Sequence, residues 1–261
     1  MKNALDVAGL IERLRAESYL ADRGLATALA CAIAMHRPLL LEGDAGVGKT
    51  DAARALARVH GAELVRLQCY DGLDLYSAAY DWNYAKQLLA IRTAEAGGRE
   101  TPDLYADEFL IRRPLLAALG AERENGVVLL IDEIDRADDE FEAYLLEYLA
   151  DFAMTLPERG RIAAAHAPIV ILTSNRTRDL HDALKRRCFY HWIGHPSLER
   201  ETDIIRMRLP GVAEALDWTQ TLDALGATRL ERRFLDDSLG TVVKYPEDIE
   251  IARDAAEALV E

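Results

Sequence analysis

The run from Gly43 to Thr50 constrains this chain more than any other part of its sequence. An apolar stretch before it, Pro38 to Glu42, predicts a strand, and Asp51 to Ala57 predicts a helix after it. Glycines between a strand and a helix allow a tight turn whose N–H groups bind phosphate. The run matches a Walker A loop at every position, and its residues are Gly43, Asp44, Ala45, Gly46, Val47, Gly48, Lys49 and Thr50.

Two side chains of this loop have a predicted chemical role. We expect Lys49 to reach the β- and γ-phosphates of a nucleotide and the Thr50 hydroxyl to bind Mg²⁺. The alternative is a glycine-rich turn that only caps a helix, and it fits the flanking segments less well. The sequence therefore predicts a protein that binds a nucleoside triphosphate such as ATP.

Composition narrows the class of protein. The 31 Lys and Arg residues against 45 Asp and Glu residues give a net charge of −14, which argues against nucleic acid as a partner. Cys31, Cys69 and Cys188 lie far apart and fit a reduced compartment. The longest apolar stretch, Leu25 to Met35, is too short to cross a bilayer. We expect a cytoplasmic protein without an integral membrane segment.

Strand-like and helical patterns alternate along most of the chain. The strands are predicted at Pro38–Glu42, Ala62–Gln68, Val127–Asp132, Pro168–Ser174 and Phe189–Ile193. Nearly continuous Val, Ile and Leu in the third and fourth indicates parallel strands that are buried on both faces. We therefore predict an α/β nucleotide-binding domain over 1–196, with helices before its first strand, and a small helical domain over 197–261.

A second acidic motif follows the third predicted strand. Asp132 and Glu133 end this strand as in a Walker B motif, so Asp132 is expected to hold Mg²⁺ and Glu133 to polarise the attacking water. The alternative is an acidic strand end that caps the next helix. We expect the later acids to form a helix N-terminal charge pattern and solvated surface: Asp135, Asp138, Asp139 and Glu140.

Polar residues near the last two strands complete the predicted site. Asn175 follows the fourth strand, where its amide is expected to contact the γ-phosphate or the attacking water; the alternative is a simple turn. Arg186 and Arg187 end a predicted helix. One of them, with Arg187 favoured, is expected to act as an arginine finger in a neighbouring subunit's site. The alternative is a favourable interaction with the helix dipole.

The order of these motifs resembles that of the AAA+ ATPases, and longer segments resemble the MoxR branch. Within that branch the chain is most similar to the CoxD-like accessory ATPases for maturation of molybdenum-containing carbon monoxide dehydrogenase. The segments that carry the resemblance are Arg66–Asp74, Tyr80–Leu89, Phe109–Leu115, Ile131–Ala137 and Leu172–Arg178.

The resemblance implies a five-stranded parallel sheet of order 5-1-4-3-2 and a helical insert around 71–113. It also implies a hairpin formed by Ala153–Pro157 and Arg161–Ala165, and an adenine pocket at Tyr19 to Ala21. Members assemble into rings, commonly hexamers, and act as ATP-driven chaperones beside a von Willebrand factor A domain protein. In the insert, the aromatic residues fit either core packing or a substrate-gripping loop: Tyr76, Tyr80, Trp82 and Tyr84.

One region departs from the family pattern. The segment Arg206 to Pro210 directly abuts Gly211 to Trp218, so we expect a C-terminal helical lid that is shortened. The second of these segments contains no arginine for the sensor-2 position. This departure affects lid closure and leaves the phosphate chemistry unchanged.

The sequence therefore predicts an ATP-hydrolysing homo-oligomer that remodels a client metalloenzyme. The resemblance implies that the client is a CO-dehydrogenase-like molybdoenzyme during assembly of its active-site cluster. Two alternatives remain: a nucleotide-gated scaffold with little hydrolysis of its own, and a motor that acts on nucleic acid, which the acidic charge disfavours.

Overall fold

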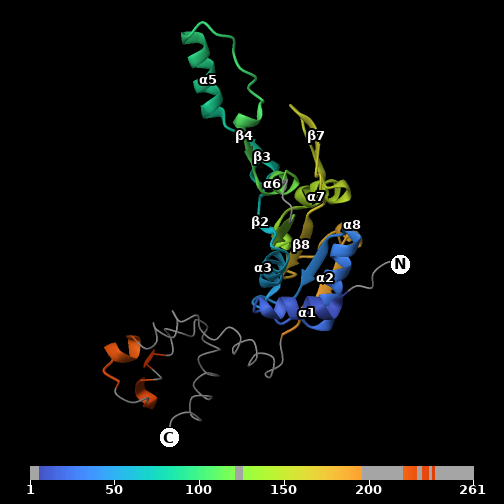
Figure 1. Ribbon diagram of the computed structural model, residues 1–261, viewed down its shortest axis with the longest axis vertical. Coiled ribbons are helices and arrows are strands. Elements are labelled where there is room, and N and C mark those ends of the chain that lie inside the picture. The colour runs from blue at the N-terminus through green and yellow to red at the C-terminus, as the bar shows by residue number, and fades with distance from the viewer. Residues whose placement is uncertain (1–5, 121–125, 196–219, 228–230, 235–236, 239–261) are drawn as a thin grey trace. The chain divides into compact units, whose positions relative to one another are not determined.

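The computed structural model describes residues 6–120, 126–195, 220–227, 231–234 and 237–238 (Figure 1). The chain divides into two compact units, Met1–Glu199 and Arg200–Glu261. The predicted lid over 197–261, including its shortened junction at 206–218, falls mostly outside the described residues. The domain boundary at 196 and the short lid therefore stay predictions.

A parallel five-stranded sheet forms the centre of the first unit, with the strand order β2-β5-β8-β1-β9. Its strands are β1 (Leu39–Glu42), β2 (Glu63–Gln68), β5 (Val127–Asp132), β8 (Ile169–Ser174) and β9 (Phe189–Trp192). Counted among these sheet strands alone, the order is 5-1-4-3-2. The predicted α/β fold class is confirmed, and every strand begins and ends within one residue of its predicted bounds.

Helices cover both faces of this sheet, because alternate residues of each inner strand face opposite cores. Val128 and Leu130 pack in one core and Leu129 and Ile131 in the other. The helices of the first core are α1 (Val7–Ala16), α2 (Arg23–Met35) and α3 (Lys49–His60). Those of the second are α6 (Pro114–Leu119), α7 (Asp139–Asp151) and α8 (Asp182–Arg187). Burial on both faces explains the continuous apolar runs.

The segment between β2 and α6 projects from this core, and Figure 1 shows its long helix α5 extending away from the five-stranded sheet. Its elements are α4 (Leu75–Ala78), β3 (Tyr80–Trp82), α5 (Tyr84–Ala96), the 3₁₀ helix η1 (Asp107–Phe109) and β4 (Leu110–Arg112). Strands β3 and β4 pair antiparallel. Tyr80 and Trp82 are buried, whereas Tyr76 and Tyr84 are exposed, so the aromatic set is divided between core and surface.

The chain between β5 and β8 contains a 3₁₀ turn, η2 (Ile134–Arg136), then α7 and a hairpin. The hairpin pairs β6 (Ala153–Leu156) with β7 (Gly160–Ala163) antiparallel, as the family resemblance implied. None of the described helices combines the length and apolar character that crossing a membrane requires.

Candidate nucleotide-binding site

The phosphate loop connects the end of β1 to the start of α3, and backbone geometry explains two of its glycines. A Cβ on Gly43 would lie 2.2 Å from the carbonyl oxygen of Ile193, which follows β9. Gly48, the N-cap of α3, has a φ of +90° that residues with a Cβ rarely adopt. Because Gly48 has no capping side chain, the N–H groups in the first turn of α3 remain available to an anion.

Lys49 begins α3, and its side chain folds back onto the loop. Its Nζ donates hydrogen bonds to the carbonyl oxygens of Gly43 at 2.8 Å and Asp44 at 2.7 Å. Burial lowers the pKa of Lys49 from its ordinary value, while the negative charges of Asp135 and Asp132 partly oppose this shift. Phosphate oxygens would offer this ammonium charged acceptors in place of neutral carbonyls.

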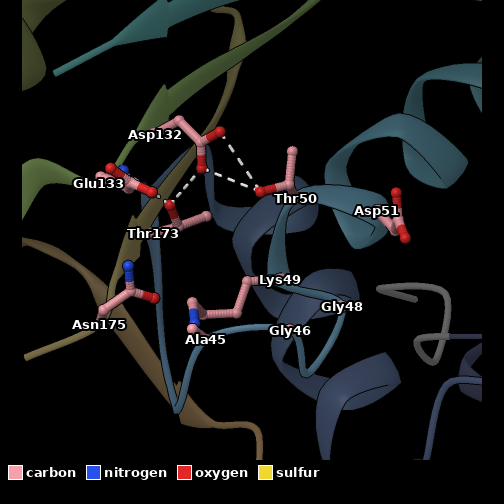
Figure 2. Close-up of a pocket in the computed structure, with 10 residues that line it drawn as sticks. All are labelled: Ala45, Gly46, Gly48, Lys49, Thr50, Asp51, Asp132, Glu133, Thr173 and Asn175. Atoms are coloured by element: carbon pink, nitrogen blue, oxygen red, sulfur yellow. Dashed lines mark hydrogen bonds between the residues drawn. The ribbon is translucent and has the colours of Figure 1, made fainter. Parts of the chain in front are cut away.

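Asp132 lies at the carboxyl end of β5, and three elements of the fold hold its carboxylate. The Thr50 hydroxyl on α3 donates to Oδ1 at 3.0 Å, and the Thr173 hydroxyl on β8 donates to the same oxygen at 2.5 Å (Figure 2). The guanidinium of Arg66 on β2 donates to Oδ2 at 2.6 Å. Asp132 is almost completely buried, and these hydrogen bonds fix the orientation of its carboxylate.

Glu133 follows β5 directly and adopts a left-handed backbone conformation with a φ of +55°. For a residue with a Cβ, this conformation costs about 1–2 kcal/mol. The Glu133 N–H donates to the Thr173 hydroxyl at 2.9 Å, which stabilises the turn. Its carboxylate pairs with Arg136 Nε at 3.0 Å. This turn places Glu133 in the wall of the same cavity as Thr50 and Asp132.

Asp135 anchors the turn that carries Asn175. Its carboxylate accepts hydrogen bonds from the Asn175 N–H at 3.2 Å and from the Thr177 N–H at 2.9 Å and hydroxyl at 2.7 Å. Because Asp135 is only 2% exposed, the expectation that it belongs to a solvated surface is wrong. The η2 turn directs it inward, whereas Asp138 caps α7 through the Phe141 N–H as expected.

The predicted motifs converge on one cavity of about 220 Å³ (Figure 2). Its lining residues are Ala45, Gly46, Gly48, Lys49, Thr50, Asp51, Asp132, Glu133, Thr173 and Asn175. The other predicted loop residues, Gly43, Asp44 and Val47, are not among them. The cavity therefore combines the start of a helix with Asp51, the carboxylates of Asp132 and Glu133, an ammonium group and an amide.

Arg186 and Arg187 lie in the last turn of α8, are exposed, and do not line this cavity. Arg37 donates to their main-chain carbonyl oxygens, at 3.0 Å for Arg186 and 3.2 Å for Arg187, and so caps the helix. Within the described part of the chain, neither guanidinium has a hydrogen bond or an ion pair of its own. Their predicted role in a neighbouring subunit stays a prediction.

The residues of the cavity fit ATP together with Mg²⁺. The Thr50 hydroxyl and Asp132 carboxylate are the hard oxygen ligands that Mg²⁺ prefers, and they lie side by side at the start of α3. The Lys49 ammonium and the first-turn N–H groups complement the negative charge of phosphates. Tyr19 also lies beside the loop, because its hydroxyl donates to the Gly48 carbonyl oxygen at 3.3 Å. Its predicted place in an adenine pocket stays a prediction.

Sequence reasoning missed four residues that line or support this site: Arg66, Thr173, Asp135 and Asp51. Arg66 carries a signal in hindsight, because a charged side chain interrupts an apolar strand pattern. Thr173, Asp135 and Asp51 carry none, since Thr is common in strands and acids are common near helix starts.

The sheet order and the position of the phosphate loop after β1 define the class of this protein. With Asp132 and Glu133 after β5 and Asn175 after the intervening strand β8, the chain is a P-loop nucleoside triphosphatase of the AAA+ type. Residues 38–188, more than half of the chain, match the AAA domain (dynein-related subfamily). The chain belongs to this family.

The other comparisons add little to this assignment. No curated protein matches the sequence. One similar solved structure is that of a putative ATPase from Cytophaga hutchinsonii, at 17% identity and a TM-score of 0.48. The match covers 77% of this chain and 53% of that protein, so this chain spans about half its length. A similarity this low carries no argument about function.

Proposed function

We propose that this protein is a Mg²⁺-dependent ATPase. The convergence of the phosphate loop, the Asp132–Glu133 pair and Asn175 on one cavity is the observation that carries the proposal. Lys49 and the loop N–H groups hold the phosphates, while Thr50 and Asp132 would hold Mg²⁺, which would neutralise phosphate charge. Glu133 accepts a proton from the attacking water, and Asn175 orients that water.

Two groups of this site must exchange partners before they can act. Lys49 has to leave the carbonyl oxygens of Gly43 and Asp44, and Glu133 has to leave Arg136. Phosphate oxygens offer Lys49 a charged acceptor, which compensates for the lost contacts. We infer that nucleotide binding prepares the site for hydrolysis.

Substitution of Glu133 tests this proposal. We expect Glu133→Gln to bind ATP and to reduce its turnover by about 10²–10⁴-fold, because the amide cannot act as a general base. The control is Glu140→Gln, an exposed acid on α7 in the same acidic run, which retains turnover. Equal turnover in the wild type and Glu133→Gln would contradict the assigned role.

We further propose that the site is completed in a ring, for which a hexamer is the expected size. An exposed Arg187 whose guanidinium has no partner among the described residues fits a group that acts on the neighbour's nucleotide, with Arg186 as the alternative. Mixing Arg187→Ala with Glu133→Gln tests this: turnover above that of either variant alone indicates a shared site, because the intact Glu133 of one subunit then meets the intact Arg187 of its neighbour. Lys185→Ala, on the same helix, serves as the control.

The finer function rests on the MoxR and CoxD-like sequence segments. We propose a cytoplasmic chaperone that, with a von Willebrand factor A domain partner, assembles the active-site cluster of a CO-dehydrogenase-like molybdoenzyme. A cluster-deficient molybdoenzyme incubated with this protein, its partner and ATP should gain activity. The gain should be absent with Glu133→Gln, and an equal gain without ATP would contradict the proposal.

A nucleotide-gated scaffold is the second candidate. It is favoured by one observation, namely that Lys49 and Glu133 both bind to other groups of the chain, Lys49 to the Gly43 carbonyl oxygen and Glu133 to Arg136. In that case the wild type would bind ATP with no more turnover than Glu133→Gln, even at high protein concentration or with its partner.

A further inference from the structure

Arg66 is a long basic side chain on β2, and the strand register brings it to Asp132. In the parallel pair, Arg66 lies opposite Leu130 and Gln68 lies opposite Asp132. Residues two apart on a strand share a face, so Arg66 and Asp132 are diagonal neighbours on one face of the sheet. Because β2 ends the sheet order, the stem of Arg66 can run along an edge strand.

The two oxygens of Asp132 share the Thr50 hydroxyl, which lies 3.3 Å from Oδ2, but differ in their other partners. Oδ1 accepts the shorter hydrogen bonds of Thr50 and Thr173, at 3.0 Å and 2.5 Å. Oδ2 accepts both Nε and Nη2 of Arg66, at 3.0 Å and 2.6 Å. Arg66 also donates to the Gln68 side chain, which helps to hold the guanidinium in place.

Because Asp132 is buried, the positive charge of Arg66 matters more to it than one further hydrogen-bond donor. The Asp132 side chain is 4% exposed and that of Arg66 is 44% exposed. Two hydroxyl groups already orient the carboxylate, but neither neutralises its charge, which is costly to bury without a counter-ion. Arg66 supplies that counter-ion, and it does so without lining the nucleotide cavity.

We propose that Arg66 is the resident counter-ion of Asp132 and sets the Mg²⁺ concentration at which the site retains nucleotide. The inference rests on the proposed binding of ATP with Mg²⁺. A guanidinium on Asp132 repels an incoming divalent cation and reduces the charge available to it. Without Mg²⁺, the same guanidinium screens Asp132 from the phosphates. Arg66 therefore opposes Mg²⁺ and favours metal-free nucleotide.

The test measures binding of a fluorescent, hydrolysis-resistant ATP analogue, first in EDTA and then as a function of Mg²⁺ concentration. We expect Arg66→Met to lower the Mg²⁺ midpoint by about three- to tenfold and to weaken binding in EDTA by a similar factor. These opposite effects distinguish loss of a counter-ion from general damage, which weakens binding in both conditions.

Matched variants separate charge from side-chain loss. Arg66→Lys keeps the charge and should stay close to the wild type. Arg58→Met removes a half-exposed arginine that pairs with Glu17 away from the cavity, and it should change neither quantity. In an Asp132→Asn background, Arg66→Met should lower the midpoint by a smaller factor, because only the direct repulsion between the guanidinium and the cation remains to be removed. If Arg66→Met does not fold, Arg66→Gln removes the charge, keeps hydrogen-bond donors and gives the same expected shifts.

The outcomes also separate this inference from the proposed function. If the wild type binds no nucleotide in either condition, the proposed function fails. If the wild type binds but neutral Arg66 variants leave the Mg²⁺ midpoint unchanged or raise it, the inference about Arg66 alone is overturned.

Discussion

The cavity end of the sheet buries charged side chains, whereas the projecting helix α5 exposes apolar side chains. At the cavity, Lys49, Asp132 and Asp135 are almost fully buried. On α5, the apolar side chains of Tyr84, Leu88 and Leu89 are 66%, 53% and 66% exposed. Residue type alone therefore predicts burial poorly in both regions, and each departure needs a physical cause.

The causes differ between the two regions. At the cavity, each buried charge has hydrogen-bond partners that offset its desolvation, as the contacts of Asp135 with Asn175 and Thr177 show. On α5, the helix has few neighbours because it extends away from the sheet (Figure 1). The cavity is therefore a region of dense polar contacts, and α5 is a region whose apolar face is uncovered within this chain's described residues.

Removing the anchor of the Asn175 turn is expected to have the largest effect. Asp135→Ala should lower the free energy of unfolding by about 2–4 kcal/mol, because the Asn175 and Thr177 N–H groups lose their buried acceptor. ATP turnover should fall with it. Chemical denaturation measures the free energy of unfolding of the variant. The control is Asp138→Ala, which removes the N-cap of α7 and should cost about 1 kcal/mol. Equal costs for the two variants would remove the contrast between buried and surface acids.

Alkaline pH is expected to have an intermediate effect through Cys69, which follows β2 beside the cavity. Burial, and then the nearby charges of Asp132 and Asp135, raise the pKa of Cys69 from 9.0 to about 12. Between pH 9 and about pH 12, the Cys69 thiol keeps its proton in the folded protein and loses it in the unfolded chain. The free energy of unfolding therefore falls as the pH rises through this range. The loss is about 1.4 kcal/mol per pH unit above 9.

Chemical denaturation at pH 7.5 and at pH 10 measures the contribution of Cys69 to the free energy of unfolding. Cys69→Ala should reduce the alkaline decline by about 1.4 kcal/mol at pH 10, whereas Cys31→Ala, at a half-buried position on α2, should retain it. A decline of the same size in Cys69→Ala would show that another group causes it.

Substitution on α5 is expected to have the smallest effect. Leu89→Ser should change the free energy of unfolding by less than about 0.5 kcal/mol, because the side chain is exposed. The control is Leu116→Ala on α6, where a fully buried leucine should cost about 2–5 kcal/mol. A cost above about 1 kcal/mol for Leu89→Ser in dilute protein would show that the α5 face is covered.

Much of the fold could be predicted because its signals are local. The five sheet strands are continuous apolar runs, and the phosphate loop is a complete motif between one of them and a helix. The hairpin of β6 and β7 and the strand order came from family resemblance, because strand pairing leaves no local signal. The division of the insert aromatics into buried Tyr80 and Trp82 and exposed Tyr76 and Tyr84 was not predictable from their spacing.

Local sequence patterns were enough to predict Lys49 and Thr50 at a glycine-rich turn as the nucleotide-binding residues, and the acids at the end of a buried strand as the Mg²⁺ and water-activating residues. These depend on chain neighbours and on the alternation of side chains along a strand. Three features follow from the packing of the fold: Arg66 pairs with Asp132, Asp135 supports the turn of Asn175, and apolar side chains of α5 are exposed. These depend on the register of parallel strands and on contacts between residues far apart in the chain, which no local pattern encodes.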